Sequence, residues 1–142
     1  MQIACCIGAL VLCGATAFAR ISETESQIEK RYGRAVSGSP STKGYFYKDF
    51  FIIVTFDNGV SGIETYEKRN RAPMSALEIG RLLEANGART KWHEAIHSGF
   101  LSRYEGKTRF AEYNAATNTL TIAEYGALHR INARNQAVNA QR

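Results

Sequence analysis

The sequence predicts an α+β fold in which two helices pack on one face of an antiparallel sheet. Two segments, 22–33 and 75–87, carry helix start and stop signals, and each is followed by short alternating apolar stretches separated by turn residues. This order, one helix and then a three-stranded antiparallel meander, occurs over about residues 21–68 and again over about 74–125. We therefore predict two tandem repeats that form one continuous sheet, because each amphipathic helix needs an apolar surface to cover.

The first helix is predicted from "SETESQIEKRYG" (22–33). Ser22 and Glu25 have the spacing of a capping box, in which each side chain accepts a hydrogen bond from the backbone N–H of the other residue. Gly33 is typical of the position just after a helix. The helix is therefore expected to begin at Ser22 and to end at Gly33.

The second helix is predicted from "SALEIGRLLEANG" (75–87). Ser75 and Glu78 repeat the capping-box spacing, and Gly87 marks the end of the helix. Gly80 has two interpretations. It either weakens the helix by about 1 kcal/mol relative to alanine, or it allows the helix to approach the sheet closely.

The stretch "YFYKDFFIIVTFDNGVSGIETY" (45–66) predicts the first meander. Its apolar residues alternate from Phe50 to Phe56, as a half-buried strand requires. Lys48-Asp49 interrupts the run, and Asp57-Asn58-Gly59 is a strong hairpin turn. The predicted strands are 44–47, 50–56 and 60–66.

The second meander is predicted from "LSRYEGKTRFAEYNAATNTLTIAEY" (101–125), with strands at about 101–105, 107–113 and 119–125. The domain would then span residues 20–126. The polar tail, 127–142, is expected to be frayed or loosely helical.

The first 19 residues predict a signal peptide. An uncharged apolar run from Ile3 to Ala19 ends in Ala17-Phe18-Ala19, which is an A-x-A cleavage pattern. Cleavage after Ala19 would give a periplasmic or extracellular protein, for which the membrane matters only through the signal segment. The positively charged side chain usual near the start of such a segment is missing.

All three cysteines, Cys5, Cys6 and Cys13, lie in this segment, so the predicted domain would depend on its core and not on disulfides. A lipid anchor on Cys13 stays an alternative to a soluble protein. The residue before a lipidated cysteine should be small, whereas here it is Leu12.

Charge and motifs limit the classes of function. The formal net charge is +5, a value that affects solubility and does not predict nucleic-acid binding. Weak binding to a polyanion stays open. The basic stretch "EKRNR" (67–71) is interpreted as a solvated linker between the repeats. The sequence has no G-x-S-x-G nucleophile motif and no phosphate-binding glycine loop after a strand. We therefore predict a protein that is not an enzyme and needs no cofactor.

One stretch, "KWHEAIH" (91–97), has the H-E-x-x-H spacing of zinc hydrolases. On a helix, His93 and His97 would be about 6 Å apart and could share a zinc ion. Glu94 would then act as the base. On a strand the two histidines would lie about 13 Å apart. Helix stops on both sides favour a short irregular strand or loop, anchored by Trp92 and Ile96. A small zinc-dependent hydrolase is kept as the alternative function.

The main functional hypothesis is an exported, non-enzymatic binding module that uses the sheet face away from the helices. If the apolar Phe50 set faces the core, aromatic and basic residues should face outward and form a protein-binding patch, because tyrosine and arginine are enriched at interface anchors. The candidate residues are Tyr45, Tyr47, Phe51, Ile53, Arg103, Arg109 and Tyr113. The alternative is that this face is covered, by residues 88–100, by the tail or by the second subunit of a homodimer.

The pattern also resembles known folds. The features that carry the resemblance are Tyr32-Gly33, "YFYKDFFIIVTFDNG", Leu82-Leu83 with Trp92, and "RYEGKTRFAEYNAATNTLTI". Together they resemble the two-layer fold of the β-lactamase-inhibitor-like proteins, of small outer-membrane-assembly lipoproteins and of small exported bacterial proteins of unassigned function. The resemblance implies that the open sheet face meets a protein partner in the cell envelope.

Overall fold

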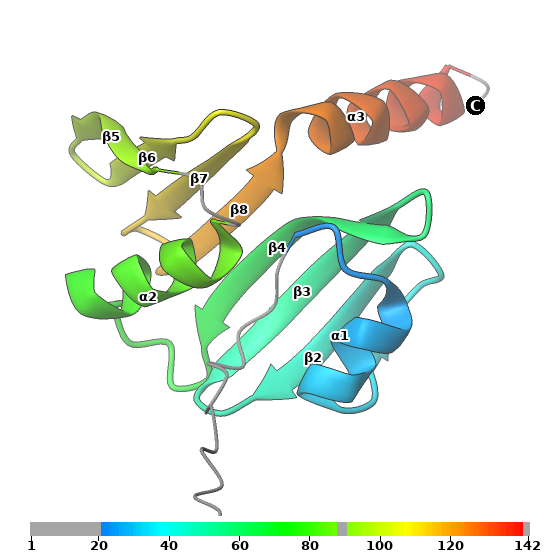
Figure 1. Ribbon diagram of the computed structural model, residues 1–142, viewed down its shortest axis with the longest axis horizontal. Coiled ribbons are helices and arrows are strands. Elements are labelled where there is room, and N and C mark those ends of the chain that lie inside the picture. Colours follow the sequence, from blue (N-terminus) through cyan, green and yellow to red (C-terminus); the bar gives the residue numbers. More distant parts are fainter. Residues whose placement is uncertain (1–20, 88–90, 141–142) are drawn as a thin grey trace, which may run out of the picture.

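The computed structural model describes residues 21–87 and 91–140 (Figure 1). The predicted signal segment and Cys13 lie outside the described residues. Within the described ranges, no helix is both long and apolar enough to span a membrane.

The fold is α+β, as predicted, and is built on one antiparallel sheet in the order β1-β2-β3-β4-β8-β7-β6-β5. The strands are β1 (Ser37–Gly38), β2 (Thr42–Tyr47), β3 (Phe50–Asp57), β4 (Val60–Lys68), β5 (His93–Ser98), β6 (Leu101–Glu105), β7 (Arg109–Asn114) and β8 (Thr119–Glu124). The six predicted strands are confirmed, each within two residues at either end. β4 and β8 pair in the middle of the sheet and so join the two halves of the chain. That these halves are internal repeats stays a prediction.

Two helices, α1 (Glu25–Tyr32) and α2 (Ala76–Asn86), lie over one face of the sheet (Figure 1). The capping box of α1 is formed by Thr24 and Gln27, so the prediction that Ser22 begins the helix is wrong. Ser22 instead donates its backbone N–H to Ser61 of β4 at 2.7 Å. This contact ties the chain to the sheet before the helix starts.

The start of α2 is confirmed, because Ser75 and Glu78 exchange the predicted hydrogen bonds at 2.7 and 3.2 Å. Gly80 lies on the exposed side of the helix, and a methyl group added there would meet no atom within 4 Å, the helix's own backbone aside. A close approach to the sheet is therefore not the reason for this glycine.

A third helix, α3 (Tyr125–Asn139), is formed by the segment predicted to be frayed or loosely helical. It extends from the end of β8 (Figure 1). Its buried Ala127 lies against Gly62 of β4. Arg130 and Arg134 donate hydrogen bonds at 2.6 and 2.7 Å to the buried carboxylate of Asp57, at the end of β3.

The hydrophobic core lies between the sheet and the two helices α1 and α2. The alternating residues from Phe50 to Phe56 are buried, as predicted. The core also contains Ile28 and Tyr32 of α1 and Ile79, Leu82 and Leu83 of α2. We call the side of the sheet that carries these residues the inner face and the opposite side the outer face.

Candidate protein-binding surface

Strand register decides which side chains reach the outer face. A two-residue turn at Lys48-Asp49 places Tyr45 opposite Ile52 and Tyr47 opposite Phe50. Residues directly opposite each other in an antiparallel pair point to the same side. Both tyrosines therefore point to the inner face, and the prediction that they face outward is wrong. Tyr45 is fully buried, with its ring 5.9 Å from that of Tyr32.

The same correction applies to two candidates on β7. Arg109 lies opposite Glu124 and Tyr113 lies opposite Leu120, which puts both on the inner face. The Tyr113 hydroxyl accepts a hydrogen bond from the backbone N–H of Met74 at 3.1 Å, and Arg109 donates to the backbone carbonyls of Asn86 and Ile21. Their visible role is to hold loops and the end of α2 against the sheet.

Three predicted candidates, Phe51, Ile53 and Arg103, do lie on the outer face, where they belong to different clusters. Phe51 and Ile53 lie on β3, and Phe46 of β2 is next to them, with ring centroids of Phe46 and Phe51 5.2 Å apart. Phe46 is 48% exposed and Ile53 is 37% exposed. The sequence prediction missed Phe46 because it assigned the adjacent tyrosines to this face.

Arg69 completes this cluster. It follows the end of β4, and its guanidinium lies 4.8 Å above the centre of the Phe46 ring. We call Phe46, Phe51, Ile53 and Arg69 the open patch. Arg69 is exposed, and no Asp or Glu of residues 21–87 and 91–140 forms an ion pair with it. The nearest outward carboxylate along β4, that of Glu67, lies 3.8 Å from Arg71.

Arg103 lies on the other half of the outer face, in a closed cluster. Its guanidinium lies 4.8 Å above the ring of Phe110, 3.1 Å from Glu105 and 3.6 Å from Glu112. A hydrogen bond with Tyr125, at the start of α3, raises the pKa of Arg103. Phe110 is only 8% exposed, and its ring is 5.2 Å from that of Tyr125.

A groove beside α3 adjoins the open patch. It has a volume of about 420 Å³ and is lined by the outward residues Thr55 and Ile63 and by Ile131 and Val138 of α3. Thr55 is the next outward residue after Ile53 on β3. The groove therefore begins next to the open patch, and its lining also includes the polar residues Ser41, Thr42, Arg134 and Asn135.

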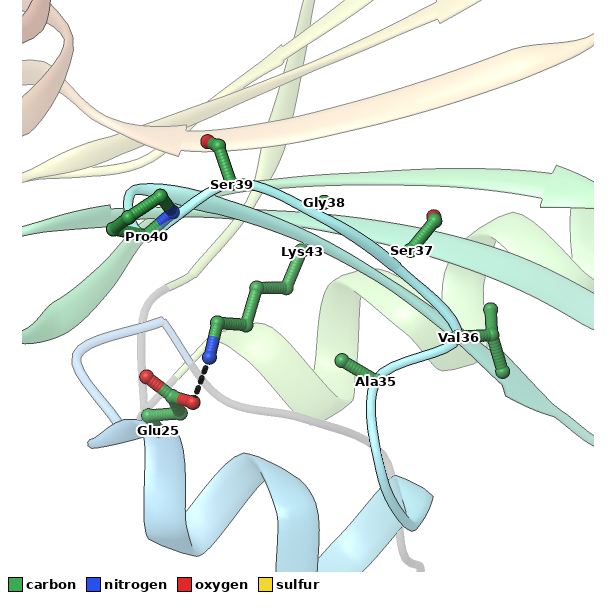
Figure 2. Close-up of a pocket in the computed structure, with 8 residues that line it drawn as sticks. All are labelled: Glu25, Ala35, Val36, Ser37, Gly38, Ser39, Pro40 and Lys43. Carbon is green, nitrogen blue, oxygen red and sulfur yellow. Dashed lines mark hydrogen bonds and ion pairs between the residues drawn. The ribbon is translucent and has the colours of Figure 1, made fainter.

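A separate hollow, of about 630 Å³, lies between the start of α1 and the segment around β1 (Figure 2). Figure 2 shows Lys43 and Glu25 pointing toward each other, and they form an ion pair. The two charged groups that line this hollow are therefore paired with each other.

The H-E-x-x-H stretch forms the irregular edge strand β5, as predicted. A bulge between Glu94 and Ile96 places His93 opposite Glu105 but His97 opposite Ser102. The two histidines therefore point to opposite faces, and in this geometry the pair does not share one zinc ion with Glu94 as base. In the described part of the chain, no three His, Cys, Asp or Glu side chains are grouped to hold a metal.

The two anchors predicted for this stretch differ. Trp92 packs against the core and donates a hydrogen bond to the backbone carbonyl of Leu83 at 2.8 Å, which confirms its role. Ile96 is 45% exposed on the outer face, so its predicted role as an anchor is wrong.

A buried polar network lies between the halves on the inner face. Glu64 of β4 is fully buried and accepts a hydrogen bond from Tyr66, whose hydroxyl also accepts one from Asn86 at 3.0 Å. Within the described residues, Glu64 Oε1 has no hydrogen-bond partner. Burial raises the pKa of the Glu64 carboxyl to about 7, although the hydrogen bond from Tyr66 lowers it. The network affects stability and does not reach the outer face.

Searches of protein-family models, of curated proteins and of solved structures found no match to this chain. The resemblance to β-lactamase-inhibitor-like proteins and assembly lipoproteins therefore stays a prediction.

Proposed function

We propose that the protein is a non-enzymatic binding module that holds a protein partner on the open patch. The main supporting observation is the exposure of Phe46 and Ile53, beside Phe51, on a regular sheet face. Aromatic residues and arginine are enriched among the residues that dominate binding energy at protein interfaces. Because the patch is built on paired strands, binding would cost little ordering of the backbone.

The predicted signal peptide adds a location to this proposal. Removal of residues 1–19 would release the domain into the periplasm or the medium, where the partner would be an envelope or secreted protein. Surface complementarity alone would carry the binding, and the proposal involves no cofactor.

Site-specific photo-crosslinking in the producing organism tests the proposal. A photoreactive phenylalanine analogue at position 46 should give a discrete crosslinked product with a partner protein. The same analogue at Leu77, which is 64% exposed on α2, serves as the control and should not give that product. No product from position 46, or the same products from both positions, would contradict the proposed function.

A further inference from the structure

We infer that the partner segment bound by the open patch carries a carboxylate next to apolar side chains, and that Arg69 binds this carboxylate. The inference rests on the proposed function and adds the chemistry of the partner. Its basis is a comparison between two arginines on the outer face of the same sheet.

Arg69 is held in place but its charge is not neutralised. The Phe46 ring supports one face of the guanidinium at 4.8 Å, because the negative face of an aromatic ring attracts a cation. The edges of the guanidinium still present N–H donors in a fixed planar arrangement. Such an arrangement suits the two oxygens of a carboxylate, which arginine binds through two parallel hydrogen bonds.

Arg103 is a stacked arginine on the same sheet whose charge is paired with carboxylates of this chain. Its distance from the Phe110 ring is also 4.8 Å, but Glu105 on its own strand and Glu112 on the neighbouring strand supply carboxylates. At Arg69 these contributions are missing among the described residues. Glu67, two positions earlier on β4, is directed to Arg71. Across from Arg69 lies Asp49, whose backbone carbonyl accepts a hydrogen bond from the backbone N–H of Arg69 at 2.8 Å. Its carboxylate forms no ion pair with the Arg69 side chain within the described residues. The next outward residues of β3 are Phe51 and Ile53. A carboxylate for Arg69 would therefore come from a partner.

The apolar part of the patch specifies the rest of the partner segment. Phe46, Phe51 and Ile53 form apolar surface directly beside Arg69, so a carboxylate on Arg69 would bring its neighbouring side chains onto these residues. The formal net charge of +5 favours encounter with an acidic partner. An acidic apolar protein segment fits both features.

Selection of phage-displayed random heptapeptides on the purified protein tests the inference. The wild-type protein should enrich peptides with Asp or Glu adjacent to apolar residues. For a synthetic peptide of the enriched sequence, Arg69→Gln should weaken binding by about tenfold or more, because a hydrogen bond to a charged group is lost. Arg81→Gln removes an exposed arginine of α2 and is the matched control. It should change the affinity by less than about twofold.

Three results are distinguishable. Enriched acidic apolar peptides that depend on Arg69 and not on Arg81 would support the inference. A second result is enrichment of peptides that need Ile53 but have no acidic residues in common and bind Arg69→Gln as well as wild type. This result would overturn the inference and would still agree with the proposed function. Enrichment no greater than on Ile53→Asp protein would count against both.

Discussion

The two halves of the outer face carry the same arginine–phenylalanine contact in different surroundings. Arg69 above Phe46 and Arg103 above Phe110 have equal ring distances of 4.8 Å. Phe110 is 8% exposed, whereas Phe46 is 48% exposed. The stacked pair alone therefore does not decide whether the surface is open, because the same pair belongs to a closed cluster in one half and to an open patch in the other.

The difference follows from what surrounds each pair. In the β6–β7 half, Tyr125 at the start of α3 packs on Phe110, and two glutamates neutralise Arg103. In the β2–β4 half, α3 lies beside the turn between β3 and β4, where Arg130 and Arg134 bind Asp57 and Ala127 lies against Gly62. The middle of β2 and β3 is left open among the described residues.

The largest expected effect concerns Glu64, which lies where the halves meet. Burial raises its pKa from 4.5 to about 7 in the folded protein, because the fold favours the protonated carboxyl. The resulting contribution to the unfolding free energy is fully present below pH 4.5 and is lost as the pH rises through 7. Between pH 5 and 9 the unfolding free energy should fall by about 3 kcal/mol from this group. Urea unfolding at several pH values should show the fall, and Glu64→Gln should remove it. An unchanged pH profile in Glu64→Gln would assign the dependence to another group.

A smaller effect is expected from separating α3 from the sheet. A Cβ atom at Gly62 would lie 2.6 Å from the Cβ of Ala127, so Gly62→Ala should lower the unfolding free energy by about 2 kcal/mol through overpacking. Chemical denaturation followed by circular dichroism measures the loss. Adding Ala127→Gly should recover part of it, despite the cost of a helical glycine of about 1 kcal/mol. If the double variant loses as much unfolding free energy as Gly62→Ala and Ala127→Gly lose together, the close packing of α3 on β4 would be contradicted.

The two arginines themselves give the smallest stability effects and the clearest contrast. Arg103→Gln should lower the unfolding free energy by about 1 kcal/mol, because two carboxylates lose a partially buried partner. Arg69→Gln should change it by no more than about 0.5 kcal/mol. Thermal and urea unfolding of both variants measure the difference. Equal losses would mean that Arg69 is as integrated in the fold as Arg103.

Local sequence patterns predicted most of the fold because strand alternation, hairpin turns and the Ser75 cap act over a few residues. The predicted start of α1 is wrong because two pairs, Ser22–Glu25 and Thr24–Gln27, have the spacing of a capping box. The hydrogen bond from Ser22 to β4 holds Ser22 outside the helix, so Thr24 is the cap. α3 gave little signal because Ala127 is its only buried residue among those described.

The candidate site was predicted only in part, for geometric reasons. The prediction for Tyr45 and Tyr47 assumes that side chains keep alternating between the two faces through the turn at Lys48-Asp49. A two-residue hairpin turn instead places the flanking residues on the same face. The bulge in β5 similarly separated His93 from His97. Arg69, within the stretch interpreted as a linker, meets Phe46 only after three strands have paired, so no local pattern could predict the contact.

Substitution of two isoleucines distinguishes whether the partner binds the open half of the outer face, as we propose, or the other half. Ile53 and Ile96 are 37% and 45% exposed on the same face, one in each half of the sheet. The measurement is the yield of the crosslinked product from position 46 in Ile53→Asp and in Ile96→Asp protein. We predict a loss of about tenfold or more for Ile53→Asp, because a charge enters an apolar contact, and little change for Ile96→Asp. Equal yields in the two variants would contradict the claim.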